Sequence, residues 1–127
     1  MCNTILVVDD EKSMRRLLNA ILVEYGFAVD VAASTREADE LLAGKGYDAV
    51  VVDYHMPEED GIQWMTRLQA GGFATPCLLI SGGAEEALRH AARHIRLAGV
   101  MCKPFDLSDF VEMVKRHTWH CGCPEPA

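Results

Sequence analysis

Short, almost wholly apolar runs recur along the chain, separated by stretches that mix polar and apolar residues. The runs cover residues 5–8, 27–29, 49–52, 77–80 and 100–102. A run that is apolar at every position is typical of a strand buried on both faces, as in the centre of a parallel sheet. The run at 27–29 is the weakest because Asp30 interrupts it, and we predict that it forms an edge strand.

The stretches between the runs carry apolar residues at the spacing that lines one face of a helix. Ser34 and Glu37 form a capping-box signature, and Gly26 and Gly44 are placed to end helices. The predicted helices cover residues 14–25, 34–44, 61–70 and 84–97, and a last one begins near Asp106.

Strand and helix alternate five times, which predicts an α/β fold with a parallel sheet covered on both faces by right-handed crossovers. For five units the flavodoxin-like strand order 2-1-3-4-5, flanked by five helices, is the natural arrangement. We expect one domain over residues 1–118. Residues 119–127 change character and are expected to form a loose tail or the start of a linker.

The candidate site residues directly follow the first, third, fourth and fifth apolar runs. They are Asp9 and Asp10 after the first, Asp53 after the third, Ser81 and Gly82 after the fourth, and Lys103 and Pro104 after the fifth. The carboxyl ends of parallel strands share one edge of the sheet, and in this strand order a crevice opens there between the first and third strands. We therefore expect these residues to converge on one pocket.

Three carboxylates in one pocket need a compensating charge. Two unit charges ~4 Å apart repel by roughly 4 kcal/mol at an effective dielectric constant near 20. Lys103 can offset one carboxylate, and a hard divalent cation can offset the others. Mg²⁺ suits a site of a few carboxylates, a backbone carbonyl, waters and a phosphate. The sequence therefore predicts a magnesium site.

The same residues suit phosphoryl transfer to a carboxylate. Asp53 can attack a phosphoryl group and form an acyl phosphate. The protein must then position the group and stabilise charge on its three equatorial oxygens. The cation can hold one oxygen, Lys103 a second, and the Ser81 hydroxyl with a nearby backbone N–H the third, while Gly82 leaves room for close approach. We expect Asp53 to be open to an incoming phosphorus atom.

Four motifs in a fixed order carry a family resemblance. They are Val7-Val-Asp-Asp-Glu11 with Met14-Arg15, Val51-Val-Asp-Tyr-His-Met-Pro57 followed by Asp60-Gly61, Ser81-Gly82, and Lys103-Pro104-Phe105. Each motif means little alone, but their order and separations together are highly specific. Over residues 4 to about 117 the chain resembles the receiver domain of two-component response regulators, close to the chemotaxis-regulator type.

The resemblance implies a signalling switch that works with Mg²⁺ and takes its phosphoryl group from a histidine kinase or phosphotransfer protein. It implies only slow self-catalysed phosphotransfer and dephosphorylation, not an enzyme with turnover. The implied roles are phosphoacceptor for Asp53, direct metal ligands for Asp10, Asp53 and the His55 backbone carbonyl, a water-mediated metal contact for Asp9, phosphoryl contacts for Ser81 and Lys103, and a cis bond before Pro104.

Two positions bear on how such a switch would work. Receivers usually carry Tyr or Phe three residues before the lysine, where the ring moves inward as the Ser or Thr shifts toward the phosphoryl group. Here the residue is Val100, which leaves phosphate binding untouched but removes that signal to the surface of the fourth helix, fifth strand and fifth helix. His55 occupies a position where the residue varies among receivers. Its ring can point to solvent, which is the interpretation we favour, or it can shield the acyl phosphate from water.

Charge and hydropathy exclude several classes of function. Of 127 residues, 50% are hydrophobic and 24% charged, and the formal charge of −7 gives no general attraction to nucleic acid. The basic patch at residues 89–96 is favoured as a solvated helix face over a docking surface. No apolar run approaches the ~20 residues that span a bilayer, and no secretory signal precedes the first strand. We expect a cytoplasmic monomer or weak dimer with reduced thiols.

The end of the chain raises two further questions. Its potential zinc ligands are His117, His120, Cys121 and Cys123. Cys-x-Cys is a less usual zinc spacing than Cys-x-x-Cys, so a zinc site is not favoured. The chain works either alone or as the receiver of a longer regulator with an unknown output partner, and the cysteine-bearing end slightly favours a stand-alone protein.

Three other functions fit the sequence less well. A haloacid-dehalogenase-type phosphatase places its nucleophile and acid as Asp-x-Asp, whereas Tyr54 and His55 follow Asp53 here. A flavodoxin is disfavoured because an acidic first loop would repel the cofactor phosphate. A degenerate receiver that only binds partners is disfavoured because the acidic cluster, Ser81 and Lys103 are all present.

Overall fold

The computed structural model describes residues 3–83, 89, 93 and 95–118. Its sheet has five parallel strands in the order β2-β1-β3-β4-β5, which confirms the predicted strand order. The strands are β1 (Thr4–Val8), β2 (Ala28–Ala32), β3 (Ala49–Asp53), β4 (Cys77–Ser81) and β5 (Gly99–Cys102).

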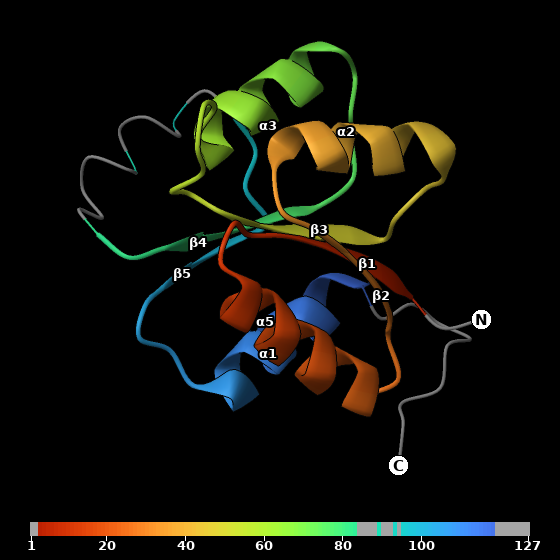
Figure 1. The fold of residues 1–127 in the computed structure, drawn as a ribbon, viewed down its shortest axis with the longest axis vertical. Helices are drawn as coiled ribbons and strands as arrows, with labels where there is room; N and C mark the ends of the chain where they lie inside the picture. Colours follow the sequence, from red (N-terminus) through yellow and green to blue (C-terminus); the bar gives the residue numbers. More distant parts are fainter. Residues whose placement is uncertain (1–2, 84–88, 90–92, 94, 119–127) are drawn as a thin grey trace.

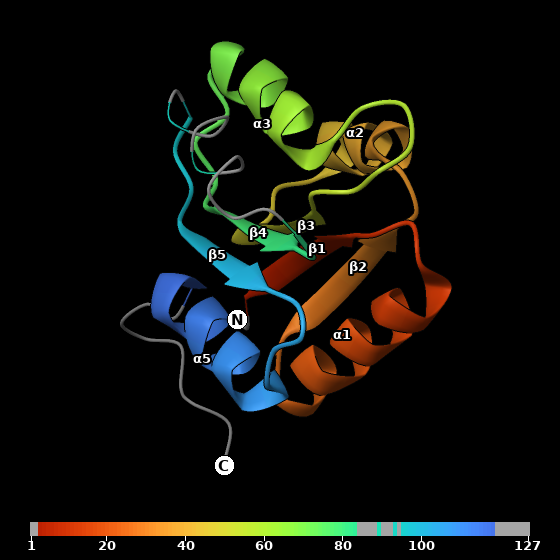
Figure 2. The same cartoon turned by 90° about the vertical axis from the view of Figure 1, so that its left-hand side faces the viewer.

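Helices cover both faces of the sheet, as Figures 1 and 2 show. On one face lie α1 (Lys12–Glu24) and α5 (Leu107–Thr118), and on the other lie α2 (Thr35–Gly44) and α3 (Gly61–Ala70). Most of the helix predicted over 84–97, with its basic patch, falls outside the described residues, as does the tail at 119–127 with the potential zinc ligands His120, Cys121 and Cys123. The fourth potential ligand, His117, lies within α5. None of the described helices combines the length and apolarity needed to cross a bilayer.

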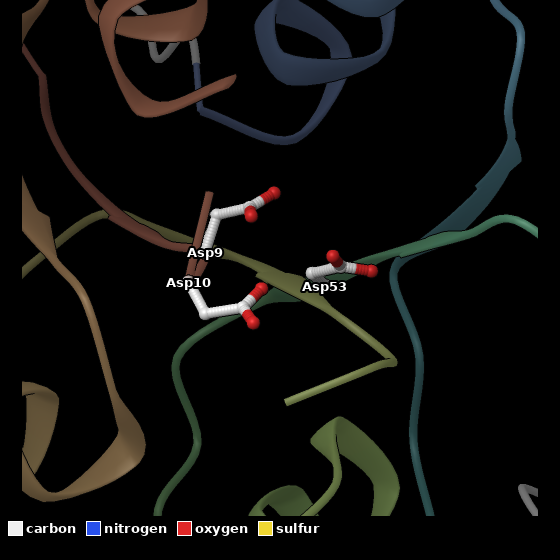
Figure 3. A group of neighbouring side chains, drawn as sticks. All are labelled: Asp9, Asp10 and Asp53. Atoms are coloured by element: carbon white, nitrogen blue, oxygen red, sulfur yellow. The ribbon is translucent and has the colours of Figure 1, made fainter. Parts of the chain in front are cut away.

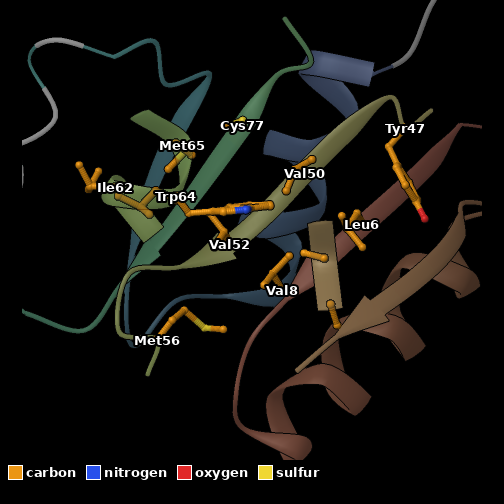
Figure 4. Packing of buried hydrophobic residues seen from close by; sticks show 13 residues of the cluster. Leu6, Val8, Tyr47, Val50, Val52, Met56, Ile62, Trp64, Met65 and Cys77 are labelled. Atoms are coloured by element: carbon orange, nitrogen blue, oxygen red, sulfur yellow. The ribbon is translucent and has the colours of Figure 1, made fainter. Parts of the chain in front are cut away.

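Successive residues of the central strands enter two different cores, which explains why the runs are continuously apolar. Leu6 and Val52 belong to the cluster beneath α2 and α3, shown in Figure 4. Val7 and Val51, their neighbours in the chain, belong to the cluster beneath α1 and α5. Because side chains alternate across a strand, burying both faces requires an apolar residue at every position.

The edge strand β2 is longer than predicted, and Asp30 lies inside it. Asp30 pairs in register with Leu6 of β1 and does not end the strand. Its carboxylate accepts a hydrogen bond from the Tyr47 hydroxyl at 2.6 Å and lies 3.0 Å from the Lys45 ammonium. These bonds lower the pKa of Asp30 and make a charged residue tolerable in an edge strand. The predicted edge position is confirmed.

The start of α2 only partly matches its predicted capping box. Ser34 Oγ accepts a hydrogen bond from the Glu37 amide at 3.1 Å, but Glu37 Oε1 accepts from the amide of Ala33, one residue earlier than in a capping box. A complete capping box occurs at α3, between Asp60 and Gln63. It fixes the point where α3 leaves the loop that follows Asp53.

Gly61 allows α3 to begin directly against the end of β3. A Cβ atom at this position would stand 2.8 Å from the backbone carbonyl oxygen of Asp53 and 3.1 Å from Leu79 Cδ1. The first contact is with backbone, which cannot move aside easily. The glycine therefore brings α3 close to the strand that carries Asp53.

We expect Gly61→Ala to lower the free energy of unfolding by about 1–3 kcal/mol, the usual cost of overpacking. Gly44→Ala is the matched control because a Cβ there meets nothing within 4 Å. It should be neutral or slightly stabilising, since Ala favours helix over Gly. Urea unfolding of both variants measures the difference, and equal stabilities would contradict the close-approach argument.

Candidate functional site

The three predicted carboxylates lie together at the carboxyl edge of the sheet. Asp9 and Asp10 follow β1 and Asp53 ends β3, and these two strands pair in parallel through Val8 and Val52. One carboxylate oxygen from each aspartate lies within 4.8 Å of the others. Figure 3 shows the three side chains side by side beyond the strand ends. The predicted convergence of the acidic residues is therefore observed.

Asp53 is more enclosed than expected, with only 3% of its side chain exposed. Its Oδ1 accepts a hydrogen bond from the His55 amide at 3.3 Å, and its Oδ2 accepts one from the Lys103 ammonium at 3.3 Å. Both oxygens thus have partners, and the lysine covers one of them. The expectation of an open carboxylate does not hold in this conformation.

Asp9 is buried, whereas its neighbour Asp10 is exposed. Asp9 Oδ1 accepts a hydrogen bond from the Glu11 amide at 2.9 Å, but buried Oδ2 has no hydrogen-bond partner in the described part of the chain. Burial raises the pKa of the Asp9 carboxyl to about 6, and the charge of Asp53 adds to the effect, against opposing contributions from the Glu11 amide and Lys103.

Lys103 connects the acidic cluster to the other side of the site. Its backbone amide donates to the Ser81 carbonyl at 2.7 Å, so the ends of β4 and β5 are joined. Its ammonium also lies 3.8 Å from Glu11 Oε1. Partial burial lowers the pKa of Lys103, but the negative charges of Asp53, Asp9 and Glu11 outweigh this and raise it overall.

Ser81 and Gly82 lie beside Lys103, as predicted. Ser81 is buried, and its hydroxyl oxygen accepts a hydrogen bond from the Gly83 amide at 3.3 Å. A Cβ on Gly82 would make only an ordinary contact, 3.8 Å from Lys103 Cδ, so packing alone does not require a glycine there. The bond between Lys103 and Pro104 is cis, as the family resemblance implied.

The two departures from the family pattern lie near the site but outside the acidic cluster. Val100 is 42% exposed and lines a surface cavity of about 490 Å³ with Met101, Pro104 and Phe105. His55 is exposed, and its ring meets that of Tyr54 edge-on at 4.9 Å between centroids.

Sequence reasoning assigned no role to Arg15 or Glu11, although both lie in the first motif. The Arg15 guanidinium donates from Nη1 to the Asp9 backbone carbonyl at 2.8 Å and so holds the turn after β1. Glu11 contributes its amide to Asp9 and its carboxylate to Lys103. The available signal was their place in the first motif, where Glu11 directly follows the aspartate pair and Arg15 lies five residues after Asp10.

The donor set fits a hard divalent cation. Asp9, Asp10 and Asp53 offer only oxygen ligands, which Mg²⁺ prefers. The unpartnered Oδ2 of Asp9 is the independent observation, because a buried polar oxygen without a partner is costly unless something binds it. The residues present therefore suit magnesium.

Comparisons with known proteins agree with this arrangement. Residues 5–115 match the family model for the response regulator receiver domain. The chain is 34% identical over 114 residues to regulatory protein AtoC of Escherichia coli, covering 90% of this chain and 25% of that protein. It is 35% identical over 115 residues to transcriptional regulatory protein SrrA of Staphylococcus aureus, covering 91% of this chain and 47% of that protein. It thus spans half or less of these relatives.

Solved structures share the fold. The Francisella response regulator 1452 receiver domain has a TM-score of 0.85 at 25% identity, with 91% of this chain and 96% of that chain covered. Vibrio cholerae chemotaxis protein CheY4 has a TM-score of 0.84 at 24% identity, with 92% of this chain and 99% of that chain covered. The family model, which matches most of the chain, shows that the chain belongs to the receiver domain family of two-component response regulators.

Proposed function

We propose that Asp53 accepts a phosphoryl group from a histidine kinase or histidine phosphotransfer protein, and that this modification switches a partner-binding surface. The observation that carries the proposal is the convergence of Asp9, Asp10 and Asp53 with the Lys103 ammonium at one edge of the sheet. Membership of the receiver family supports the class of donor.

In the proposed reaction an Asp53 carboxylate oxygen attacks phosphorus. A new O–P bond forms, the bond from phosphorus to the donor's histidine nitrogen breaks, and that nitrogen keeps the electron pair. Attack by Oδ2 requires displacement of the Lys103 ammonium, which contacts that oxygen at 3.3 Å. Glu11, 3.8 Å away, offers it another negatively charged partner.

Lys103 and Ser81 are the groups we assign to the phosphoryl oxygens. The lysine supplies a positive charge, and the serine hydroxyl supplies a donor from the adjacent strand. The hydrogen bond from the Lys103 amide to the Ser81 carbonyl, 2.7 Å long, supports a joint role because it fixes their separation. Gly82 keeps the turn free of a side chain for the incoming group.

We assign the magnesium ligands to Asp10, Asp53 and the His55 backbone carbonyl, with Asp9 contacting the ion through water. The unpartnered Asp9 oxygen and the clustered carboxylates support this assignment. A bound Mg²⁺ would supply positive charge for the carboxylates and for an equatorial phosphoryl oxygen. The slow phosphotransfer and dephosphorylation implied by family resemblance would occur at this site without a separate catalytic domain.

The wider setting is proposed on family grounds. We assign the receiver domain to residues 1–118 and a tail or linker to 119–127. The output partner is either a separate protein or an appended domain, since the curated relatives extend well beyond the matched region. A cytoplasmic location, a monomeric or weakly dimeric state, and no direct nucleic-acid binding by this domain complete the proposal, the last because the net charge is −7.

Asp53→Asn tests the phosphoacceptor. Acetyl phosphate with MgCl₂ should add one phosphoryl group to the wild-type chain. It should add none to the variant, because an amide oxygen is a far weaker nucleophile than a carboxylate. Intact-mass spectrometry measures the adduct, with an EDTA reaction as the metal-free control. Labelling of the variant, or steady turnover of phosphate esters by the wild type, would contradict the proposal.

Asp9→Asn tests the buried carboxylate through pH. Since folding raises the Asp9 pKa from 3.8 to about 6, the folded chain retains a proton between these pH values that the unfolded chain loses. The contribution of the Asp9 carboxyl to the free energy of unfolding therefore falls as the pH rises from 3.8 to about 6. At ~1.36 kcal/mol per pKa unit, we expect the variant to be more stable than wild type by about 2–3 kcal/mol at pH 7.5 in EDTA.

At pH 4 the two proteins should differ little, because the Asp9 carboxyl is then protonated in the folded chain. Urea unfolding at several pH values measures the difference in free energy of unfolding between the variant and the wild type. Adding MgCl₂ should reduce this difference by stabilising the wild type. If the stability difference between the two proteins did not change with pH, burial of the Asp9 charge could not be its cause.

His55→Ala tests shielding of the acyl phosphate. His55 Nε2 lies 4.0 Å from where a Cβ on Gly83 would stand, so the imidazole lies beside the turn after Ser81. If it limits access of water, its removal should shorten the phosphoryl lifetime about two- to tenfold, a barrier change of up to about 1.4 kcal/mol. Mass spectrometry after removal of donor measures the decay, with His117→Ala on α5 as the control. An unchanged lifetime would favour a ring that only faces solvent.

A further inference from the structure

Residues 54–60, here called the Asp53 loop, connect β3 to α3 and are anchored at both ends and at Met56, which packs into the core with 8% of its surface exposed. The Tyr54 amide donates to the Ile80 carbonyl at 2.8 Å, and the Gly61 amide donates to the Tyr54 carbonyl at 3.0 Å. Between these points Glu58 adopts a positive φ of 70°, a conformation that costs a non-glycine residue energy. Residues 57–60, between buried Met56 and α3, therefore form the part of the loop that a further contact can hold in place.

The side chain of Glu59 supplies a connection from the loop to α3. Arg67 donates to Glu59 Oε2 from Nε at 3.0 Å and to Oε1 from Nη2 at 2.8 Å. This two-pronged contact fixes the orientation of both groups, which a single contact from a lysine would not do. The Arg67 contact lowers the pKa of the Glu59 carboxyl, with a smaller contribution from Thr35 at the start of α2.

Arg67 is in turn attached to the buried core. Its Nη2 donates to Asp39 Oδ2 at 2.9 Å, and Asp39 Oδ1 accepts a hydrogen bond from Trp64 Nε1 at 2.9 Å. Trp64 is fully buried in the core cluster of Figure 4. The chain of contacts Glu59–Arg67–Asp39–Trp64, here called the loop clamp, therefore joins the Asp53 loop to a side chain that cannot move freely.

The clamp is more than an ordinary surface ion pair. An isolated exposed pair contributes little, because solvent screens it and two side chains lose freedom. Here one guanidinium serves two carboxylates, and the side chains of Asp39 and Glu59 are only 35% and 27% exposed. Once Arg67 is ordered by Asp39, its contact with Glu59 costs less conformational entropy.

We propose that the loop clamp is a positioning device for the phosphorylation site, which sets magnesium affinity by holding the Asp53 loop in place. This inference rests on the proposed function, in which the backbone of His55 in this loop contributes a metal ligand. None of the clamp residues belongs to the acidic cluster, so they would act only through the loop. Groups that orient metal ligands change metal affinity without touching the ion.

The test compares Mg²⁺ affinity in Arg67→Gln with that of the wild type. Loss of a group that directly supports a ligand weakens metal binding about 10- to 100-fold; since Arg67 acts through Glu59, we expect a decrease of about three- to tenfold. Amide NMR titration with MgCl₂ measures the dissociation constant. Arg116→Gln, an exposed substitution on α5 across the sheet, is the matched control and should bind as the wild type does.

Glu59→Gln provides a second route to the same result, because it keeps the shape of the side chain but removes its charge. It should also weaken Mg²⁺ binding. Combining it with Arg67→Gln should add little, since each substitution alone already breaks the contact between Glu59 and Arg67. Stability in EDTA is measured in parallel by urea unfolding. A clamp that is only structural would lower stability and leave Mg²⁺ affinity unchanged, and that result would overturn the inference.

The outcomes separate this inference from the proposed function. If the wild-type protein fails to bind Mg²⁺ at millimolar concentration, the proposed metal site is wrong and the clamp has nothing to position. If the wild type and both clamp variants bind equally, the metal site stands and the clamp proposal alone is overturned.

Discussion

Concentrated negative charge at one edge of a buried sheet is the constraint on which the rest of this structure depends. Asp9 and Asp53 are almost fully buried, and Asp10 lies beside them. Charges of one sign tolerate such proximity only when cations or hydrogen-bond donors offset them. Lys103 provides the cation, and the amides of Glu11 and His55 provide donors. Asp9 Oδ2 has no hydrogen-bond partner among the described residues, so these protein groups alone do not complete the compensation.

Sequence patterns could predict the sheet because the physics of its strands is local. Side chains alternate between two cores, so a strand such as Ala49–Asp53 is recognisable from its own residues. The site followed from the same logic, since parallel strands place their ends along one edge. The extent of β2 could not be predicted in this way, because Asp30 is tolerated through contacts with Tyr47 and Lys45, which are distant in the chain.

Features that depend on side-chain conformation were also beyond the sequence. The contact of the Asp53 carboxylate with the Lys103 ammonium joins residues 50 positions apart in the chain. The contact of Arg67 with Asp39 spans 28 positions and follows no helical or strand period. In the sequence, Arg67 and Asp39 look like ordinary charged residues on exposed helix faces. Their arrangement depends on how α2, α3 and the loop after β3 pack together.

Val100 has a consequence for how a phosphorylated state could be read by a partner. It is exposed on β5, beside a surface cavity, at a position where the family resemblance implies an aromatic ring. Rotation about valine's one side-chain torsion merely exchanges methyl and hydrogen positions around a fixed carbon. The outline of the protein at this residue therefore stays nearly constant whatever its neighbours do. A partner docking here would have to sense displacement of the main chain of β5 rather than the burial of a ring.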